Sequence, residues 1–167
     1  DAQRLVCEHL VIDVCTLWQL SADQPGTLFL THYHAPPDFP PPPEIMDARE
    51  SVPWVLDRVL NGEDTILSRL TDAPAEAACD LEVWRHYGIK SFLTLPLSAG
   101  GSAAFGALNF NVIRDERVWP PDLVKRLKLV GQVFANALLR KRAEASLRQK
   151  TEELDQFFNL ALDLLGI

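Results

Sequence analysis

Residues 90–113 decide the fold of this chain. They read KSFLTLPL at 90–97, SAGGS at 98–102 and AAFGALNFNVI at 103–113. Two runs rich in aliphatic, aromatic and β-branched residues flank a Gly-Gly turn, which is the pattern of an antiparallel β-hairpin. Pro96 has no N–H group, so we expect it at a bulge or at a position without a pairing partner.

Three further segments complete the predicted sheet. Residues 11–20 (VIDVCTLWQL) and 27–34 (TLFLTHYH) form a second hairpin across the turn SADQPG, and residues 65–69 form a short strand. The run PPDFPPPP at 36–43 predicts a rigid surface loop, or alternatively a polyproline segment that a partner domain binds. We expect an antiparallel sheet whose strands are neighbours in the order 27–34, 11–20, 103–113, 90–97, 65–69.

The middle of the chain carries two helical patterns. Asp47 or Ser51 can cap the first helix, which Asn61-Gly62 ends. Asp80 can cap a short second helix over 81–87.

These elements predict an α+β fold, in which helices flank an antiparallel sheet of five or six strands. We expect the N-terminal helix, of which residues 1–10 are the end, and the C-terminal helix on one face of the sheet. Leu108 and Phe110 should point toward these two helices, and the middle helices and loops should cover the other face.

A long helix begins at Pro121. Apolar residues recur at helical spacing as far as Phe134, and no Gly or Pro after Gly131 interrupts the pattern before about Glu153. From Arg140 on, the apolar positions become fewer, and this thinner seam predicts a parallel two-stranded coiled coil; its residues are Arg140, Ala143, Leu147 and Leu154. The alternative is a single solvated helix. We expect a homodimer, because an apolar strip on a long helix is costly unless a partner covers it.

Composition limits the possible functions. The chain has 167 residues, 47% of them hydrophobic, and a net charge of −7, which argues against a nucleic-acid partner. Residues 1–120 hold 8 basic and 17 acidic side chains, whereas residues 121–167 hold 8 basic and 6 acidic ones. No apolar run approaches the ~20 residues of a membrane span, so we expect no membrane contact.

The cysteines favour a reducing compartment. Cys7, Cys15 and Cys79 are three in number and form no closely spaced pair, so a disulfide framework is not expected. We interpret them as small buried residues and expect a cytoplasmic location.

Aromatic residues are the first candidates for a binding site. Trp18, Trp54, Trp84 and Tyr87 either line a small-molecule pocket between the sheet and the middle helices or form ordinary core. His32 shares a strand face with His34, but further metal ligands are missing nearby, so no metal is expected.

Polar residues within apolar strands are the second group of candidates. Asn109 and Asn111 share a strand face with Phe105, and a buried Asn needs partners that either the backbone or a ligand supplies. Thr94 on the neighbouring strand is a weaker candidate of the same kind. Arg49 is either an anion-binding residue or half of a surface ion pair.

Several stretches together resemble the GAF domains of bacterial signalling proteins, over residues 1–142. The likeness rests on GIKSFLTLPL at 88–97, FGALNF at 105–110, RVWPPDL at 117–123 with LVGQVFANAL at 129–138, and ARESVPW at 48–54 with SRL at 68–70. Residues 143–156 resemble the helical linker between sensor modules. Residues 157–167 (FFNLALDLLGI) resemble the first helix of a truncated PAS domain.

The resemblance implies a non-enzymatic sensory domain of a signal-transduction protein, with a histidine kinase as the parent. It would bind a small ligand and pass a conformational shift through a dimeric C-terminal helix to output kinase domains in the same parent chain. Kinase catalytic and phosphoacceptor regions are absent from residues 1–167, as is a glycine-rich nucleotide box. The alternatives are a ligand-free dimerisation spacer and a redox enzyme with this fold.

No cofactor is expected, because the family's sharper chemistries lack their motifs here. Bilin-binding members attach the pigment through a Cys, but no Cys-His or Asp-x-Cys-Phe pattern surrounds Cys79. Cys7 and Cys15 lie too early for the clustered cysteines of the methionine sulfoxide reductases. The Asn-Lys-x-Asp-Phe signature of the cyclic-nucleotide binders is also missing.

Overall fold

The structure is a computed structural model that describes residues 2–165, with the side chains of residues 3–160. Its helices are α1 (Ala2–Leu10), α2 (Ala48–Ser51), α3 (Pro53–Leu60), α4 (Ala78–His86) and α5 (Pro121–Leu165), with short 3₁₀ turns η1 (Leu70–Asp72) and η2 (Ala75–Ala77). Its strands are β1 (Val14–Leu20), β2 (Thr27–His34), β3 (Ile45–Asp47), β4 (Thr65–Leu67), β5 (Ser91–Leu97) and β6 (Gly106–Val112).

The six strands form one antiparallel sheet in the order β3-β2-β1-β6-β5-β4. This confirms the order expected from the sequence and adds β3 at the edge beside β2. β3 was missed because three residues directly after a proline-rich run carry no alternating pattern. Pro96 pairs in register with Ala107 on β6 and lies past the end of β4, so β5 has one neighbouring strand there.

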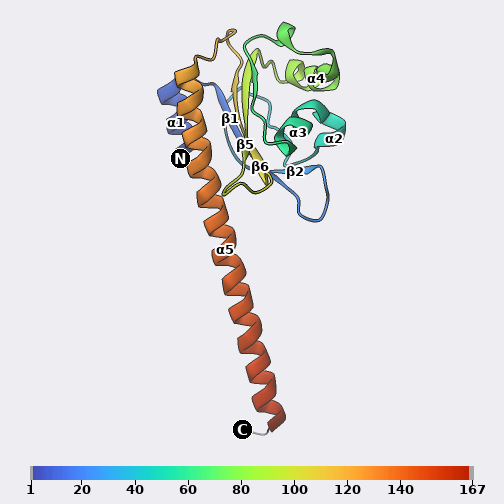
Figure 1. The fold of residues 1–167 in the computed structure, drawn as a ribbon, viewed down its shortest axis with the longest axis vertical. Coiled ribbons are helices and arrows are strands. Elements are labelled where there is room, and N and C mark those ends of the chain that lie inside the picture. The colour runs from blue at the N-terminus through green and yellow to red at the C-terminus, as the bar shows by residue number, and fades with distance from the viewer. Residues whose placement is uncertain (1, 166–167) are drawn as a thin grey trace. The chain divides into compact units, whose positions relative to one another are not determined.

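Helices cover both faces of the sheet, as Figure 1 shows: α1 and the beginning of α5 on one face, and α2, α3 and α4 on the other. Leu108 and Phe110 are fully buried on the face of α1 and α5. On that face Leu95 lies against Gly131 in α5, where a Cβ atom would be 3.5 Å from the leucine. The expected arrangement of the two layers is confirmed.

The central strands β1 and β6 approach each other closely at Gly106. A Cβ atom on this residue would lie 2.3 Å from the carbonyl oxygen of Trp18. Real Cβ atoms do not come so near to backbone oxygen, so only glycine lets the two strands pair at this position.

The middle helices differ from the prediction in two ways. The first predicted helix is split into α2 and α3, because Pro53 has no N–H group to continue α2 and instead begins α3. Asp47 does cap α2, accepting a hydrogen bond from the backbone N–H of Arg49 at 3.0 Å. Asp80 does not cap its own helix: it lies inside α4, and its carboxylate binds the N-terminus of α3 instead.

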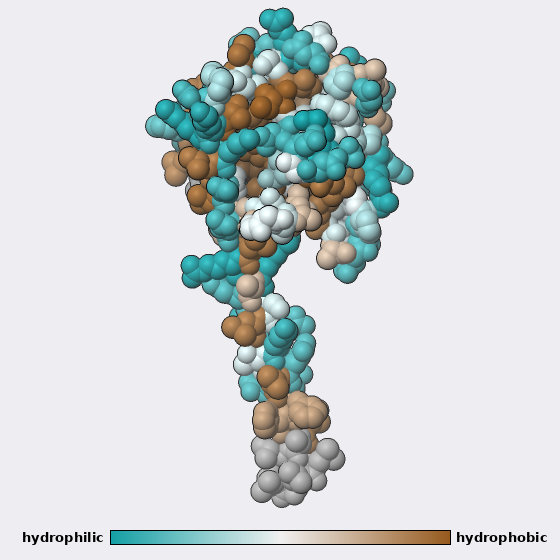
Figure 2. All heavy atoms as spheres, viewed as in Figure 1, coloured by the Kyte–Doolittle hydropathy of each residue, from teal (hydrophilic) through white to brown (hydrophobic). Residues whose placement is uncertain are grey.

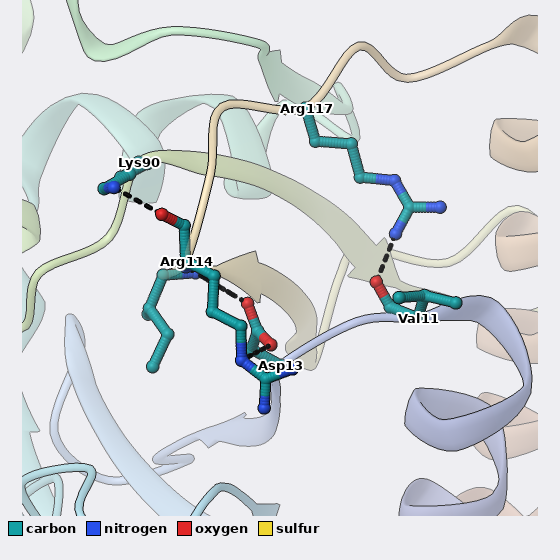
Figure 3. A network of polar contacts seen from close by, with 6 residues as sticks. Val11, Asp13, Lys90, Arg114 and Arg117 are labelled. Carbon is teal, nitrogen blue, oxygen red and sulfur yellow. Dashed lines mark hydrogen bonds and ion pairs between the residues drawn. The ribbon is translucent and has the colours of Figure 1, made fainter.

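A network of polar contacts holds the loop between β6 and α5 (Figure 3). Asp13 accepts a hydrogen bond from the backbone N–H of Arg114 at 3.3 Å and forms an ion pair with the guanidinium of the same residue at 3.2 Å. Lys90 donates to the carbonyl of Arg114, and Arg117 donates to the carbonyl of Val11. Val11 has a φ of +53°, a strained value for a β-branched residue, so the α1–β1 turn is held in an uncommon conformation.

The chain divides into two compact units, Asp1–Gln132 and Val133–Ile167, and α5 runs through both. The helix starts at Pro121 as predicted and continues past Glu153 as far as Leu165. Its described side chains from residue 140 to residue 160 are all exposed. Side-chain pairs spaced four residues apart follow this stretch, among them Arg140–Glu144 at 2.8 Å and Arg148–Glu152 at 3.0 Å.

Apolar residues also lie at the surface of this stretch of α5. Leu147 is 68% exposed and Leu154 is 58% exposed. Figure 2 shows hydrophobic residues between hydrophilic ones along this part of the helix. Within the described residues, no helix combines the length and the apolar character that crossing a bilayer requires.

Candidate functional site

A cavity of about 570 Å³ lies between the sheet and the helices α2, α3 and α4. Its size falls within the range of small-molecule sites, about 300–1,000 Å³. The proline-rich loop contributes Phe39, Pro42 and Pro43, so this loop covers part of the cavity and is more than a surface connection.

Polar side chains form the floor of the cavity. Thr16, Asn109 and Thr94 lie opposite one another in register across β1, β6 and β5. The indole Nε1 of Trp18 donates a hydrogen bond to the hydroxyl of Thr16 at 3.1 Å. The side-chain oxygen of Asn109 is buried and has no hydrogen-bond partner among the described residues. The floor therefore presents one acceptor that no protein group of the described chain satisfies.

Aromatic rings form the walls. Trp84 packs on Phe92 with ring centroids 4.3 Å apart. Trp54, which does not itself line the cavity, meets Trp84 edge to face at 6.3 Å. Tyr87 stacks on Phe39 of the proline-rich loop at 5.6 Å. Burial raises the pKa of the Tyr87 hydroxyl, so this group stays protonated and neutral throughout the physiological range.

Asp80 fixes the position of two helices that cover the cavity. Its carboxylate is fully buried and accepts the backbone N–H groups of Trp54 at 3.2 Å and Val55 at 3.0 Å. These are unpaired donors at the start of α3, where the helix dipole also favours a negative charge. Burial raises the pKa of Asp80, and these hydrogen bonds oppose that shift. Asp80 thus anchors α4 to the N-terminus of α3.

The charged side chains that line the cavity are mostly acidic. Asp47, Glu50 and Glu82 line it, and neither Lys nor Arg does so among the described residues. His86 is the one histidine among the lining residues of the described chain. Arg49 is turned away from the cavity, because its guanidinium donates to the carbonyl oxygen of Pro25.

The structure brings six of the residues singled out in the sequence together around this cavity: Trp18, Trp84, Tyr87, Thr94, Asn109 and Asn111. Thr16, Phe39 and the two glutamates were not singled out. Thr16 lies beside Asn109 because β1 pairs with β6. These two strands were expected from the sequence to be neighbours, so Thr16 could have been identified as a candidate. Phe39 had no such signal in the sequence, because a proline-rich segment does not indicate which part of the domain it covers.

Four other candidates do not line the cavity. His32 and Arg49 are exposed, and Phe105 precedes β6 instead of lying within it. Trp54 packs with Trp84 in the core cluster beneath η2 and α4. Their expected role in ligand binding has no geometric support from this cavity.

The cysteines lie away from the cavity. Cys7 and Cys15 are buried, as expected, and Cys15 alternates with the cavity-lining Thr16 and so faces the opposite side of the sheet. The hydrogen bond with Cys7 and burial raise the pKa of the Cys15 thiol well above its ordinary value. Cys79 is exposed, contrary to expectation, because the start of α4 faces solvent at this position; its thiol donates to the carbonyl oxygen of Glu50 at 3.2 Å.

No metal centre is formed by the part of the chain that the structure describes. Within it, no group of three or more His, Cys, Asp or Glu side chains is placed to hold an ion.

Comparison with known proteins matches residues 1–138 to the GAF domain family. No curated protein is significantly similar to the chain in sequence. GAF3 of Slr1393 from Synechocystis, in its photoproduct state, is 19% identical with a TM-score of 0.69, covering 87% of this chain and 93% of that chain.

Two further solved structures have the same fold. The phycocyanobilin-bound GAF domain from a cyanobacterial phytochrome is 14% identical with a TM-score of 0.70, covering 85% of this chain and 82% of that chain. A methyl-accepting chemotaxis protein is 15% identical with a TM-score of 0.67, covering 83% of this chain and 84% of that chain.

Proposed function

The chain belongs to the GAF domain family, and from this premise we propose that it is a non-enzymatic sensory module that binds a small ligand between its sheet and helices α2–α4. The observation that carries the proposal is the cavity itself. It combines aromatic walls with a polar floor, and the floor includes an acceptor without a protein partner among the described residues. Mostly apolar walls with a few directed polar groups are typical of small-molecule sites.

The second part of the proposal is how the signal leaves the domain. β6 supplies Asn109 to the cavity floor, and the loop that follows it leads directly into α5. A ligand that favours one position of β6 or of this loop shifts the population of α5 conformations by its difference in affinity for the two states. A chemotaxis protein among the similar structures is consistent with a signalling role.

We further propose that α5 pairs with a second copy of the chain. Arg140, Ala143, Leu147 and Leu154 are all exposed and recur at a spacing of three, four and seven residues. A parallel homodimer would bury this seam and carry a signal along the helix axis. The parent protein in this proposal is a histidine kinase, with residues 143–156 as a linker to a PAS domain that starts at about residue 157.

The test is stabilisation by a ligand. A compound that binds the folded chain and not the unfolded one stabilises the fold, by about 2.7 kcal/mol at a ligand concentration a hundredfold above Kd. This stabilisation appears as a higher melting temperature. We expect at least one fraction of a bacterial metabolite extract to raise the melting temperature of the chain. If no fraction does so, the alternative function applies: a dimerisation spacer without a ligand.

A matched pair of variants links such stabilisation to the cavity. Val55→Trp adds an indole ring to a lining residue, whereas Val118→Trp makes the same change at an exposed loop position. The first variant should lose the response to the active fraction, and the second should keep it. If both variants are still stabilised by the active fraction, the binding site lies elsewhere.

A further inference from the structure

We infer that this cavity selects an aromatic nitrogen compound, neutral or cationic, that donates hydrogen bonds, and that it discriminates against anions. The inference deepens the proposed function and rests on it. Three independent features of the cavity carry it: its walls, its floor and the charges that line it.

The walls favour an aromatic ligand. Trp18 and Trp84 are both almost fully buried and line the cavity, and the stacked pair of Phe39 and Tyr87 also lines it. Aromatic faces pack on flat rings in offset or edge-to-face geometry. The same faces carry a partial negative charge, so they attract a cation and not an anion.

The floor favours a ligand that donates a hydrogen bond. The side-chain oxygen of Asn109 is a buried acceptor without a partner among the described residues. Its register neighbour Thr16 already accepts a hydrogen bond from Trp18. A ligand N–H or O–H satisfies the asparagine oxygen, whereas a carboxylate or phosphate oxygen adds a second acceptor against it.

The ionic groups favour a cation. Asp47, Glu50 and Glu82 line the cavity, and the described lining holds no Lys or Arg. Asp47 is partly compensated by Arg49, whose Nε lies 3.9 Å from its carboxylate. The glutamates are exposed, so their field reaches a bound ligand with some screening by solvent. Within residues 1–120, acidic side chains outnumber basic ones, and this net negative charge adds to the repulsion of an anion.

The test uses three probes of equal shape: 2-naphthamidine, 2-naphthamide and 2-naphthoate. They carry the same ring system with a cationic donor, a neutral donor and an anionic acceptor, respectively. Isothermal titration calorimetry on the whole chain should rank their affinities in that order. We expect the amidine to bind at least about tenfold more tightly than the carboxylate, and the difference should shrink as salt is added.

Two test variants and one control separate the effect of the acidic lining from that of the Asn109 acceptor. Glu50→Gln with Glu82→Gln should weaken the amidine several-fold and leave the amide unchanged, while Glu76→Gln, at an exposed carboxylate outside the lining, should change neither. Asn109→Leu should weaken both donor probes and leave the carboxylate unaffected. A melting curve of each unliganded variant shows whether it is folded before titration.

The outcomes are distinct from those of the proposed function. If 2-naphthoate binds as tightly as the amidine, or more tightly, the inference about charge is wrong while ligand binding stands. If none of the three probes binds but a metabolite fraction still stabilises the chain, the inference is again wrong and the proposed function survives. If the probes and all fractions fail, both are rejected.

Discussion

Removing the Asp80 carboxylate should destabilise the domain more than its place near the start of a surface helix suggests. The side chain is fully buried and accepts the N–H groups of both Trp54 and Val55. In Asp80→Ala these two donors at the start of α3 lose their partner, and the contact between α3 and α4 loses its polar anchor. Asp80→Asn keeps one acceptor oxygen in the same place.

The size of the effect follows from opposing contributions. A hydrogen bond to a charged acceptor contributes about 1.5–3 kcal/mol, and loss of a helix cap costs about 0.5–2 kcal/mol. Desolvation of the buried carboxylate offsets part of this, since burial is the main cause of its raised pKa. We therefore expect Asp80→Ala to lose about 2–3 kcal/mol of unfolding free energy and Asp80→Asn about half as much.

The pH dependence has a defined sign. Because the pKa of Asp80 is raised in the folded state, the folded chain binds this proton more tightly than the unfolded chain does. The contribution of this group to stability is therefore complete below its ordinary pKa of 3.8 and falls as the pH rises through the folded pKa. As the pH is lowered through that window, the free energy of unfolding of the wild type should rise relative to that of Asp80→Asn.

Urea denaturation followed by tryptophan fluorescence measures these differences. Glu82→Ala serves as the control, because it removes an exposed carboxylate from the same helix and should change stability by less than about 0.5 kcal/mol. An Asp80→Ala variant as stable as this control would refute the assignment of Asp80 as the anchor of α3.

The other predictions concern packing, the dimer and the cavity floor. Gly106→Ala should cost several kcal/mol of stability or prevent folding, because its Cβ would overlap the neighbouring strand. Gly131→Ala should instead stabilise the chain by up to about 1 kcal/mol, since its Cβ meets only ordinary contacts inside a helix. Melting curves of the two variants test both expectations. Leu147→Glu with Leu154→Glu should give monomers that keep their melting transition, and sedimentation showing a wild-type monomer at high concentration would reject the dimer for this chain. Asn109→Leu should leave the unliganded chain as stable as before or stabler by about 1 kcal/mol, because it removes a buried acceptor that lacks a protein partner; a large loss in urea denaturation would contradict this.

The sheet was predictable because its strands carry local signals. The Gly-Gly turn fixes the β5–β6 hairpin, and alternation along β6 separates Leu108 and Phe110 from Asn109. The long C-terminal helix was equally visible, since apolar residues recur at helical spacing as far as Phe134 and no Gly or Pro after Gly131 interrupts the pattern. Signals of this kind need no knowledge of residues distant in the sequence.

The parts that escaped prediction depend on long-range contacts. Asp80 sits where a helix cap is expected, yet its partners are 25 and 26 residues earlier in the chain. Phe39 enters the cavity wall through its stacking on Tyr87, which a proline-rich sequence gives no reason to expect. Arg49 looked available for an anion, but the fold turns it toward the carbonyl of Pro25.

One measurement tests the central claim that the cavity under α2–α4 is the ligand site. Amide proton–nitrogen NMR spectra of the whole chain, recorded with increasing 2-naphthamidine, report which residues sense the probe. The account predicts saturable shifts at Thr16, Thr94 and Asn109 and along α4, all at the floor and wall of the cavity. Saturable shifts confined to residues 121–165 would contradict it.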